Sequence, residues 1–232
     1  MFVDFHSHVL PGVDDGSKSI EESVQLLRML ARQGADTVIA TPHYDPSRES
    51  VMRFVERRDE SFENLKKVMD DGQPKILLGA EVAYYQGISR MEELDKLCIE
   101  GTNLLLLEMP MSKWSSYTVN EIVNMASVRG ITPILAHVER SFGYQSSSVI
   151  RAIKDGDVLS QINASYLISI TTKRKAIRLL SIGGAQVIGS DCHNTVSRPP
   201  RLDEAYSIIE KKLGERFVSD LADFGKSLVA MN

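Results

Sequence analysis

The sequence has little cysteine and no excess of positive charge. Cys98 and Cys192 are the only two cysteines among 232 residues. A single disulfide would be unusual in a chain long enough to bury a substantial core, so both thiols are predicted to be reduced. The formal net charge is -4, whereas proteins that bind nucleic acids or anionic membranes normally present a basic surface. The charge therefore favours neither partner, and an anionic substrate would have to be bound by local groups.

Long apolar runs and targeting patterns are also missing. The sequence contains no apolar run of roughly 18 residues, the length that would indicate a membrane-spanning helix. The first residues, MFVDFHSH, lack the basic start and apolar core of a signal peptide. The sequence therefore predicts a cytoplasmic protein without membrane insertion.

Nothing in the sequence divides the chain into parts. Its composition, 43% hydrophobic and 25% charged, is that of an ordinary folded domain rather than of a disordered chain. There is no internal repeat and no long linker rich in proline, glycine or serine. We expect residues 1–232 to form a single domain.

Short β-rich runs alternate with helical patterns along the whole chain. Most of these runs are almost entirely apolar, which is typical of strands covered on both faces. One of the intervening helices is expected to start with a capping box at Thr118 and Glu121. Alternation of this kind predicts βα units around a parallel sheet, in one closed or nearly closed barrel. The seven predicted strands are residues 2–5, 37–41, 75–79, 103–107, 132–136, 158–163 and 185–189.

Histidines and carboxylates follow these strands where each strand ends. All five histidines of the sequence occupy such positions. In a parallel barrel the carboxyl ends of the strands meet on one face, so these side chains are expected to converge. A lone histidine there is usually only hydrogen-bonded, and it is the complete set that indicates a site. Only the sixth strand lacks an obvious ligand. The set comprises His6, His8, His43, Glu81, Glu108, His137, Asp191 and His193.

Imidazole and carboxylate groups together are typical ligands of Zn²⁺, Mn²⁺ or Fe²⁺. His6 and His8 are two residues apart, so on an extended backbone they point the same way and can chelate one ion. Asp191 and His193 repeat this spacing. The supply of ligands exceeds one tetrahedral site, which indicates two or three ions bridged by carboxylates, with Glu81 as the expected bridge.

Several short motifs make the pattern specific. They are His6-x-His8, Asp14-Asp15-Gly16, Thr41-Pro42-His43, Glu81, Glu108, His137-x-Glu139-Arg140 and Ser190-Asp191-x-His193. In this order, from residue 2 to about residue 200, the chain resembles the polymerase and histidinol phosphatase (PHP) superfamily. Residues 10–16, and Asp191-x-His193-Asn194 followed by Arg198-Pro199-Pro200, resemble the bacterial manganese-dependent protein-tyrosine phosphatases of capsule and exopolysaccharide clusters. Val138 departs from that family, which usually has proline there.

The resemblance implies a distorted (β/α)7 TIM-like barrel with three divalent ions at the carboxyl ends of its strands. Mn²⁺ is favoured, and Zn²⁺, Fe²⁺, Co²⁺ or Mg²⁺ would also suit the ligands. Asp15 is assigned as a ligand because the family's aspartate directly precedes the glycine. Asp14 is expected to be a turn residue, with an orienting or proton-handling role as the alternative. The three implied sets are His6, His8, Glu81 and Asp191; Glu81, Glu108 and His137; and Asp15, His43 and His193.

The implied activity is hydrolysis of phosphotyrosine on a protein, with a bacterial tyrosine kinase tail as the expected substrate. A hydroxide bound between two ions would attack phosphorus directly, and Arg140 and Arg198 would hold the phosphoryl oxygens. A surface salt bridge is the alternative role for each arginine. Three other functions stay open: a small-molecule phosphatase similar to histidinol phosphatase, a nuclease, and a metal-binding module without activity.

One motif points to a different chemistry. Cys192 and Arg198 form a Cys-x5-Arg pattern, the signature of cysteine-dependent tyrosine phosphatases. That chemistry needs backbone N–H groups wrapped around the phosphate, usually with a glycine, and no glycine lies between these residues. If Asp191 and His193 face the ions, Cys192 between them faces away. The match is therefore interpreted as coincidental.

Overall fold

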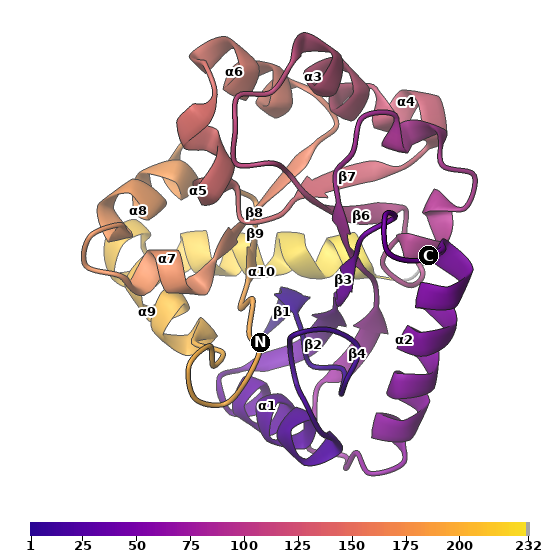
Figure 1. Ribbon diagram of the computed structural model, residues 1–232. Helices are drawn as coiled ribbons and strands as arrows, with labels where there is room; N and C mark the ends of the chain where they lie inside the picture. Colours follow the sequence, from indigo (N-terminus) through magenta and orange to yellow (C-terminus); the bar gives the residue numbers. More distant parts are fainter. Residues whose placement is uncertain (231–232) are drawn as a thin grey trace.

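The structure is a computed structural model that describes residues 1–230 (Figure 1). Its strands are β1 (Phe2–Ser7), β2 (Ala35–Ala40), β3 (His43–Tyr44), β4 (Lys75–Leu78), β5 (Glu81–Ala83), β6 (Leu104–Glu108), β7 (Thr132–Leu135), β8 (Leu159–Asn163) and β9 (Val187–Gly189). Its α-helices are α1 (Ile20–Arg32), α2 (Val51–Lys66), α3 (Ser116–Val123), α4 (Met125–Arg129), α5 (Val138–Ser141), α6 (Ser147–Asp155), α7 (Ala164–Ile168), α8 (Lys173–Ser181), α9 (Leu202–Leu213) and α10 (Glu215–Val229). Three short 3-10 turns complete it: η1 (Ile88–Arg90), η2 (Leu94–Leu97) and η3 (Phe142–Tyr144).

All strand pairings named for the sheet are parallel, in the orders β1-β2-β4 and β3-β5-β6-β7-β8-β9. The second and third predicted strands are each followed by a further short strand, β3 and β5, after breaks at Thr41-Pro42 and at Gly79-Ala80. Proline has no N–H to donate, which explains the first break. The pairing resumes beyond both breaks, because the Glu81 amide donates to the Pro42 carbonyl at 3.0 Å.

The first and last strands also meet. An isolated parallel bridge joins Ser7 to Cys192, and the Asp191 amide donates to the His6 carbonyl at 2.8 Å. The chain thus has an α/β fold with a curled parallel sheet and helices on its outer side, as Figure 1 shows. Each of the seven predicted strands is present, with ends that differ by a few residues.

Residues of the strands alternate between two apolar clusters. Leu104 and Leu106 of β6 face an inner cluster with Val3, Phe5 and other strand residues. Leu105 and Leu107 face an outer cluster that contains residues of α1, α2 and α9. Burial on both faces explains why the strands read as continuous apolar runs.

The carboxyl-terminal helices pack on this sheet. Helix α10 crosses behind β1 (Figure 1), where a Cβ at Gly225 would lie 3.1 Å from the ring of Phe5. Phe217 and Leu221 contact the outer cluster. None of the helices within residues 1–230 combines the length and apolar character needed to cross a bilayer.

The expected capping box at Thr118 and Glu121 is wrong. Helix α3 begins one turn earlier, because the Ser115 hydroxyl caps it by accepting from the Thr118 amide at 3.0 Å. The Glu121 carboxylate instead accepts from the Tyr84 hydroxyl and from the Ser89 amide and hydroxyl. A tertiary contact thus replaces the local one that the sequence suggested.

Candidate metal centre

Every candidate ligand lies at the carboxyl end of the sheet, as expected. His6, Glu81 and Glu108 belong to β1, β5 and β6, and His43 opens β3. His137 lies two residues after the end of β7. His8, Asp15, Asp191 and His193 lie in the loops after β1 and β9. Most of these side chains are buried, whereas those of Asp15, His43 and Glu108 are 67%, 40% and 37% exposed and form the open side of the site.

Glu81 is at the centre of the cluster. Its Oε2 lies 3.0 Å from His6 Nε2 and 3.0 Å from His43 Nδ1. Its Oε1 lies 2.8 Å from His137 Nε2. Burial opposes ionisation of this carboxyl, but the surrounding histidines outweigh it and hold its pKa well below the usual value. An ionised carboxylate whose two oxygens face different histidines has the arrangement of a bridging ligand.

Pairs of atoms within each ligand set implied by the resemblance lie close together. His6 Nε2 and His8 Nε2 lie 3.7 and 3.5 Å from Asp191 Oδ1. His137 Nε2 lies 3.6 Å from Glu108 Oε1. Asp15 Oδ1 lies 3.5 Å from His43 Nε2 and 3.6 Å from His193 Nε2. The groups whose ligand atoms all lie within 4.8 Å of one another overlap with the implied sets but differ from them: they are His6, His8 and Glu81; His43, Glu81 and Glu108; and His8, Asp15, His43 and His193.

His193 supplies an independent test of whether the site fits a metal. Its Nε2 is buried and has no hydrogen-bond partner within the described part of the chain. Buried polar atoms are almost always paired, so such an atom requires an explanation. Coordination of an ion by His193 together with Asp15 would account for it. The donor set thus fits divalent metal ions.

Two arginines lie on the Asp191 side of the cluster. A terminal nitrogen of Arg140 lies 2.7 Å from Asp191 Oδ2, and one of Arg198 lies 2.8 Å from Asp191 Oδ1. Both side chains are partly exposed and line a pocket of about 370 Å³. Sequence reasoning left open a phosphate contact or a salt bridge for each, and the structure places both guanidinium groups in ion pairs beside the ligands.

Gln161 and Asn163 are site residues that the sequence reasoning missed. Both lie on β8, the predicted sixth strand, which supplies no ligand. The side-chain oxygen Oε1 of Gln161 accepts from the His137 amide at 2.7 Å and lies 3.2 Å from His6 Nδ1. The signal that could have revealed them is two buried amide side chains at alternate positions of one strand, facing the same side.

Asp14 does more than the expected turn. Its Oδ1 accepts from the Gly16 amide at 2.8 Å, which is a turn contact. Its Oδ2, however, lies 2.7 Å from His8 Nδ1 and accepts from the His43 amide at 2.9 Å. Asp14 therefore orients His8, so that Nε2 of this histidine faces Glu81 and Asp191. Asp14 thus combines the turn contact with the orienting role that the sequence left as the alternative.

Two candidate ligands have strained backbones. His137 has φ 32° and Asp191 has φ 52°, and they are the only non-glycine residues with positive φ in the described chain. Such conformations cost about 1–3 kcal/mol and persist only where the surroundings fix them. Hydrogen bonds from their amides to Gln161 and to the His6 carbonyl do so.

Cys192 faces away from the cluster, as the alternation predicted. Its side chain is fully buried in the outer apolar cluster. Burial raises the pKa of the thiol above its usual value, so a nucleophilic thiolate is disfavoured. The resemblance to cysteine-dependent phosphatases is coincidental.

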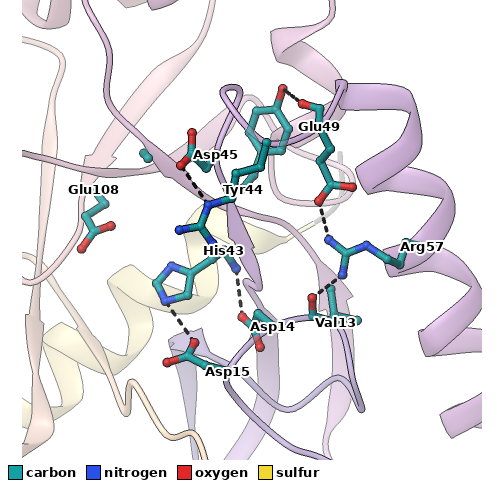
Figure 2. Close-up of a pocket in the computed structure, with 11 residues that line it drawn as sticks. Val13, Asp14, Asp15, His43, Tyr44, Asp45, Glu49, Arg57 and Glu108 are labelled. Carbon is teal, nitrogen blue, oxygen red and sulfur yellow. Dashed lines mark hydrogen bonds and ion pairs between the residues drawn. The ribbon is translucent and has the colours of Figure 1, made fainter.

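The open side of the cluster continues into a pocket of about 620 Å³. Figure 2 shows His43 beside Asp15, with Glu108 on one side and Arg57 on the other. The Arg57 guanidinium donates to the Val13 carbonyl and to the Glu49 carboxylate. These contacts join helix α2 to the loop that carries Asp15. Arg57 and Glu49 are therefore held in place in the outer wall of the pocket.

The chain is similar to known proteins over nearly all of its length. A model of the capsular polysaccharide synthesis family CpsB/CapC matches residues 2–225. Tyrosine-protein phosphatase CpsB of Streptococcus pneumoniae is 32% identical over 237 residues, which cover 94% of this chain and 94% of that protein. Tyrosine-protein phosphatase YwqE of Bacillus subtilis is 26% identical and covers 91% of this chain and 85% of its own.

A solved structure gives the same result. It belongs to the crystal structures of YwqE from Bacillus subtilis and CpsB from Streptococcus pneumoniae, described as unique metal-dependent tyrosine phosphatases. The two folds agree with a TM-score of 0.84 at 26% identity, over 98% of this chain and 94% of that one. The likeness spans every strand that carries a candidate ligand.

Proposed function

The chain belongs to the CpsB/CapC family of capsular polysaccharide synthesis, and we propose that it is a metal-dependent phosphatase that hydrolyses phosphotyrosine on a protein. The family match confirms the resemblance identified from the sequence. The relatives named above are tyrosine-protein phosphatases. The observation that carries the proposal is the convergence of histidine and carboxylate groups around Glu81, next to two arginines.

We assign the ligands to three divalent ions. His6, His8, Glu81 and Asp191 would hold the first, Glu81, Glu108 and His137 the second, and Asp15, His43 and His193 the third. Mn²⁺ is the ion we favour, because histidine and carboxylate ligands without thiolates suit it. When bound, divalent ions supply Lewis acidity that activates water and neutralises charge on the phosphoryl group.

The residues of the chain itself would bind and orient the substrate. Arg140 and Arg198 present guanidinium groups at the edge of the cluster, where they can bind two non-bridging phosphoryl oxygens. Asp191 would help to hold an ion, and its ion pairs with these two arginines would then be weaker, so that both guanidinium groups could contact the substrate. Glu81, whose two oxygens face different histidines, would help to hold more than one of these ions.

The proposal also covers the closure of the sheet and the identity of the substrate. We propose that the curled sheet is a distorted (β/α)7 barrel, supported by the bridge between Ser7 and Cys192. We propose a tyrosine kinase tail as the substrate, which the family's link to capsule synthesis supports. The cytoplasmic location stays a prediction.

The test compares substrates on the Mn²⁺-loaded protein. We expect turnover of a phosphotyrosyl peptide, little turnover of the matched phosphoseryl peptide or of histidinol phosphate, and loss of activity on chelation. His6→Ala is expected to abolish activity, and Arg198→Gln to lower kcat/KM by roughly a hundredfold, as removal of one charge-stabilising donor does. Faster turnover of histidinol phosphate than of the phosphotyrosyl peptide would instead establish the small-molecule alternative.

A further inference from the structure

The pocket on the open side of the metal centre is larger than a phosphoryl group requires. Its volume of about 620 Å³ falls within the range of about 300–1,000 Å³ that ligand sites usually have. Asp15, His43 and Glu108 form its inner wall, and the segment from Asp45 to Glu49 with Arg57 forms its outer wall (Figure 2). Under the proposed function, a peptide whose phosphotyrosine binds at the cluster has room to extend part of its chain over this face.

The two arginines of the outer wall differ in how many hydrogen bonds and ion pairs they make. The Arg57 guanidinium is held by the Val13 carbonyl and the Glu49 carboxylate. Arg48, in contrast, is 83% exposed, and its one ion pair runs from Nε to Asp45 Oδ2 at 3.3 Å. Within residues 1–230 no hydrogen bond or ion pair involves the two terminal nitrogens of Arg48.

Asp45 does not depend on Arg48. Its Oδ1 accepts from the Ser47 amide at 2.9 Å and from the Ser47 hydroxyl at 2.7 Å, so a local turn satisfies this carboxylate. An exposed ion pair contributes only about 0–1 kcal/mol of stability. Arg48 can therefore leave Asp45 and pair with a carboxylate of the substrate at little cost in free energy. Arg48 is therefore a cation at the mouth of the pocket that is available to a ligand.

We propose that Arg48 is a specificity-determining residue that binds a carboxylate side chain next to the phosphotyrosine of the substrate. This inference rests on the proposed function. A guanidinium offers a planar fork of donors that matches a carboxylate in two parallel hydrogen bonds. In the proposed function Arg140 and Arg198 bind the phosphoryl group on the Asp191 side, so Arg48 contacts a different part of the substrate. The chain thus favours phosphotyrosine in an acidic sequence.

The experiment uses the Mn²⁺-loaded protein and three substrates. Two are phosphotyrosyl peptides that differ only in having glutamate or glutamine on both sides of the phosphotyrosine, and the third is p-nitrophenyl phosphate, which has no flanking residues. We expect the glutamate peptide to have a KM about threefold lower than the glutamine peptide, with equal kcat. Added salt should reduce this preference, because the contact is exposed to solvent.

Two variants locate the effect. Arg48→Gln should remove the preference for the glutamate peptide and leave turnover of p-nitrophenyl phosphate unchanged. Arg48→Glu should reverse the preference in favour of the glutamine peptide, because its carboxylate repels the glutamate side chains. Arg53→Gln is the matched control, because Arg53 is exposed on α2 and does not line the pocket. It should behave as the unaltered protein does.

Either of two results would overturn the inference. One is an unchanged preference in Arg48→Gln, and the other is a parallel loss with p-nitrophenyl phosphate, which would mean that Arg48 contacts the phosphoryl group. Failure of the proposed function looks different, since neither peptide would then be hydrolysed in any variant.

Discussion

Asn163 donates a hydrogen bond from Nδ2 to Oδ2 of Asp191 at 2.7 Å. The same Asn163 accepts, through Oδ1, from Gln161 Nε2 at 2.8 Å. Gln161 in turn lies beside His6 and accepts from the His137 amide. A buried pair of amides on β8 therefore joins three candidate ligands that come from three other strands or their loops.

Replacement of Asn163 by leucine should weaken metal binding without unfolding the chain. Asp191 would lose a donor that fixes its orientation, and Gln161 Nε2 would lose its acceptor. Loss of such supporting contacts typically lowers metal affinity or activity by about 10–100-fold. Calorimetric titration of the metal-free protein with Mn²⁺ measures the affinity, and circular dichroism checks the fold. Asn64→Leu, on the exposed side of α2, is the control. Equal Mn²⁺ affinity in both variants would contradict the assigned role.

A methyl group at Gly189 should disturb the same region. An added Cβ would lie 2.5 Å from the Cβ of His6 and 2.8 Å from Nε2 of Gln161, so both neighbours or the strand itself must shift. We expect Gly189→Ala to lower both Mn²⁺ affinity and thermal stability. Gly143→Ala is the matched control, because a Cβ there meets nothing within 4 Å. If the two variants bind Mn²⁺ equally well, the close packing behind His6 has no effect on the site.

Cys192 is predicted to be dispensable for catalysis. Its thiol is buried among apolar side chains, away from the ligands. Cys192→Ala should retain most of the kcat for a phosphotyrosyl substrate, while a small cavity lowers the free energy of unfolding by about 1 kcal/mol. His6→Ala measured beside it should be inactive. An inactive but folded Cys192→Ala, together with an active His6→Ala, would establish cysteine chemistry instead.

Glu121 should stabilise the fold in a pH-dependent way. Burial raises the pKa of this carboxyl, but the donors Ser89, Gly87 and Tyr84 outweigh burial and lower it below the ordinary value of 4.5. A carboxyl group with a lowered folded-state pKa stabilises the fold above its unfolded pKa, and this contribution is lost as the pH falls through the folded-state pKa. Glu121→Gln should therefore destabilise the protein at neutral pH by about 1–2 kcal/mol.

Urea unfolding of the metal-free protein at neutral pH and near pH 3 measures this difference, which should shrink in acid. Glu60→Gln, at an exposed position of α2, should have little effect at either pH. A constant difference between Glu121→Gln and the unaltered protein at both pH values would exclude an ionic contribution.

The sequence predicted the strands well because their signal is local. A run such as Leu104–Leu107 is apolar at every position, which is typical of a short strand covered on both faces. Turn and cap signals were less reliable. Thr118 and Glu121 fit a capping box by spacing, but Ser115 fits the same role one turn earlier, and spacing alone does not choose between them.

The sequence by itself determined which residue types stand at the carboxyl ends of the strands, and hence that histidines and carboxylates gather on one face. Parallel strands bring their ends together whatever the details of packing. Only the tertiary structure decided which of these groups touch. The orientation of His8 by Asp14, and of Asp191 by Asn163, depends on side-chain directions across strands far apart in the chain. Amide side chains carry no charge to mark them in a sequence, so their role appears only when burial forces each polar atom to find a partner.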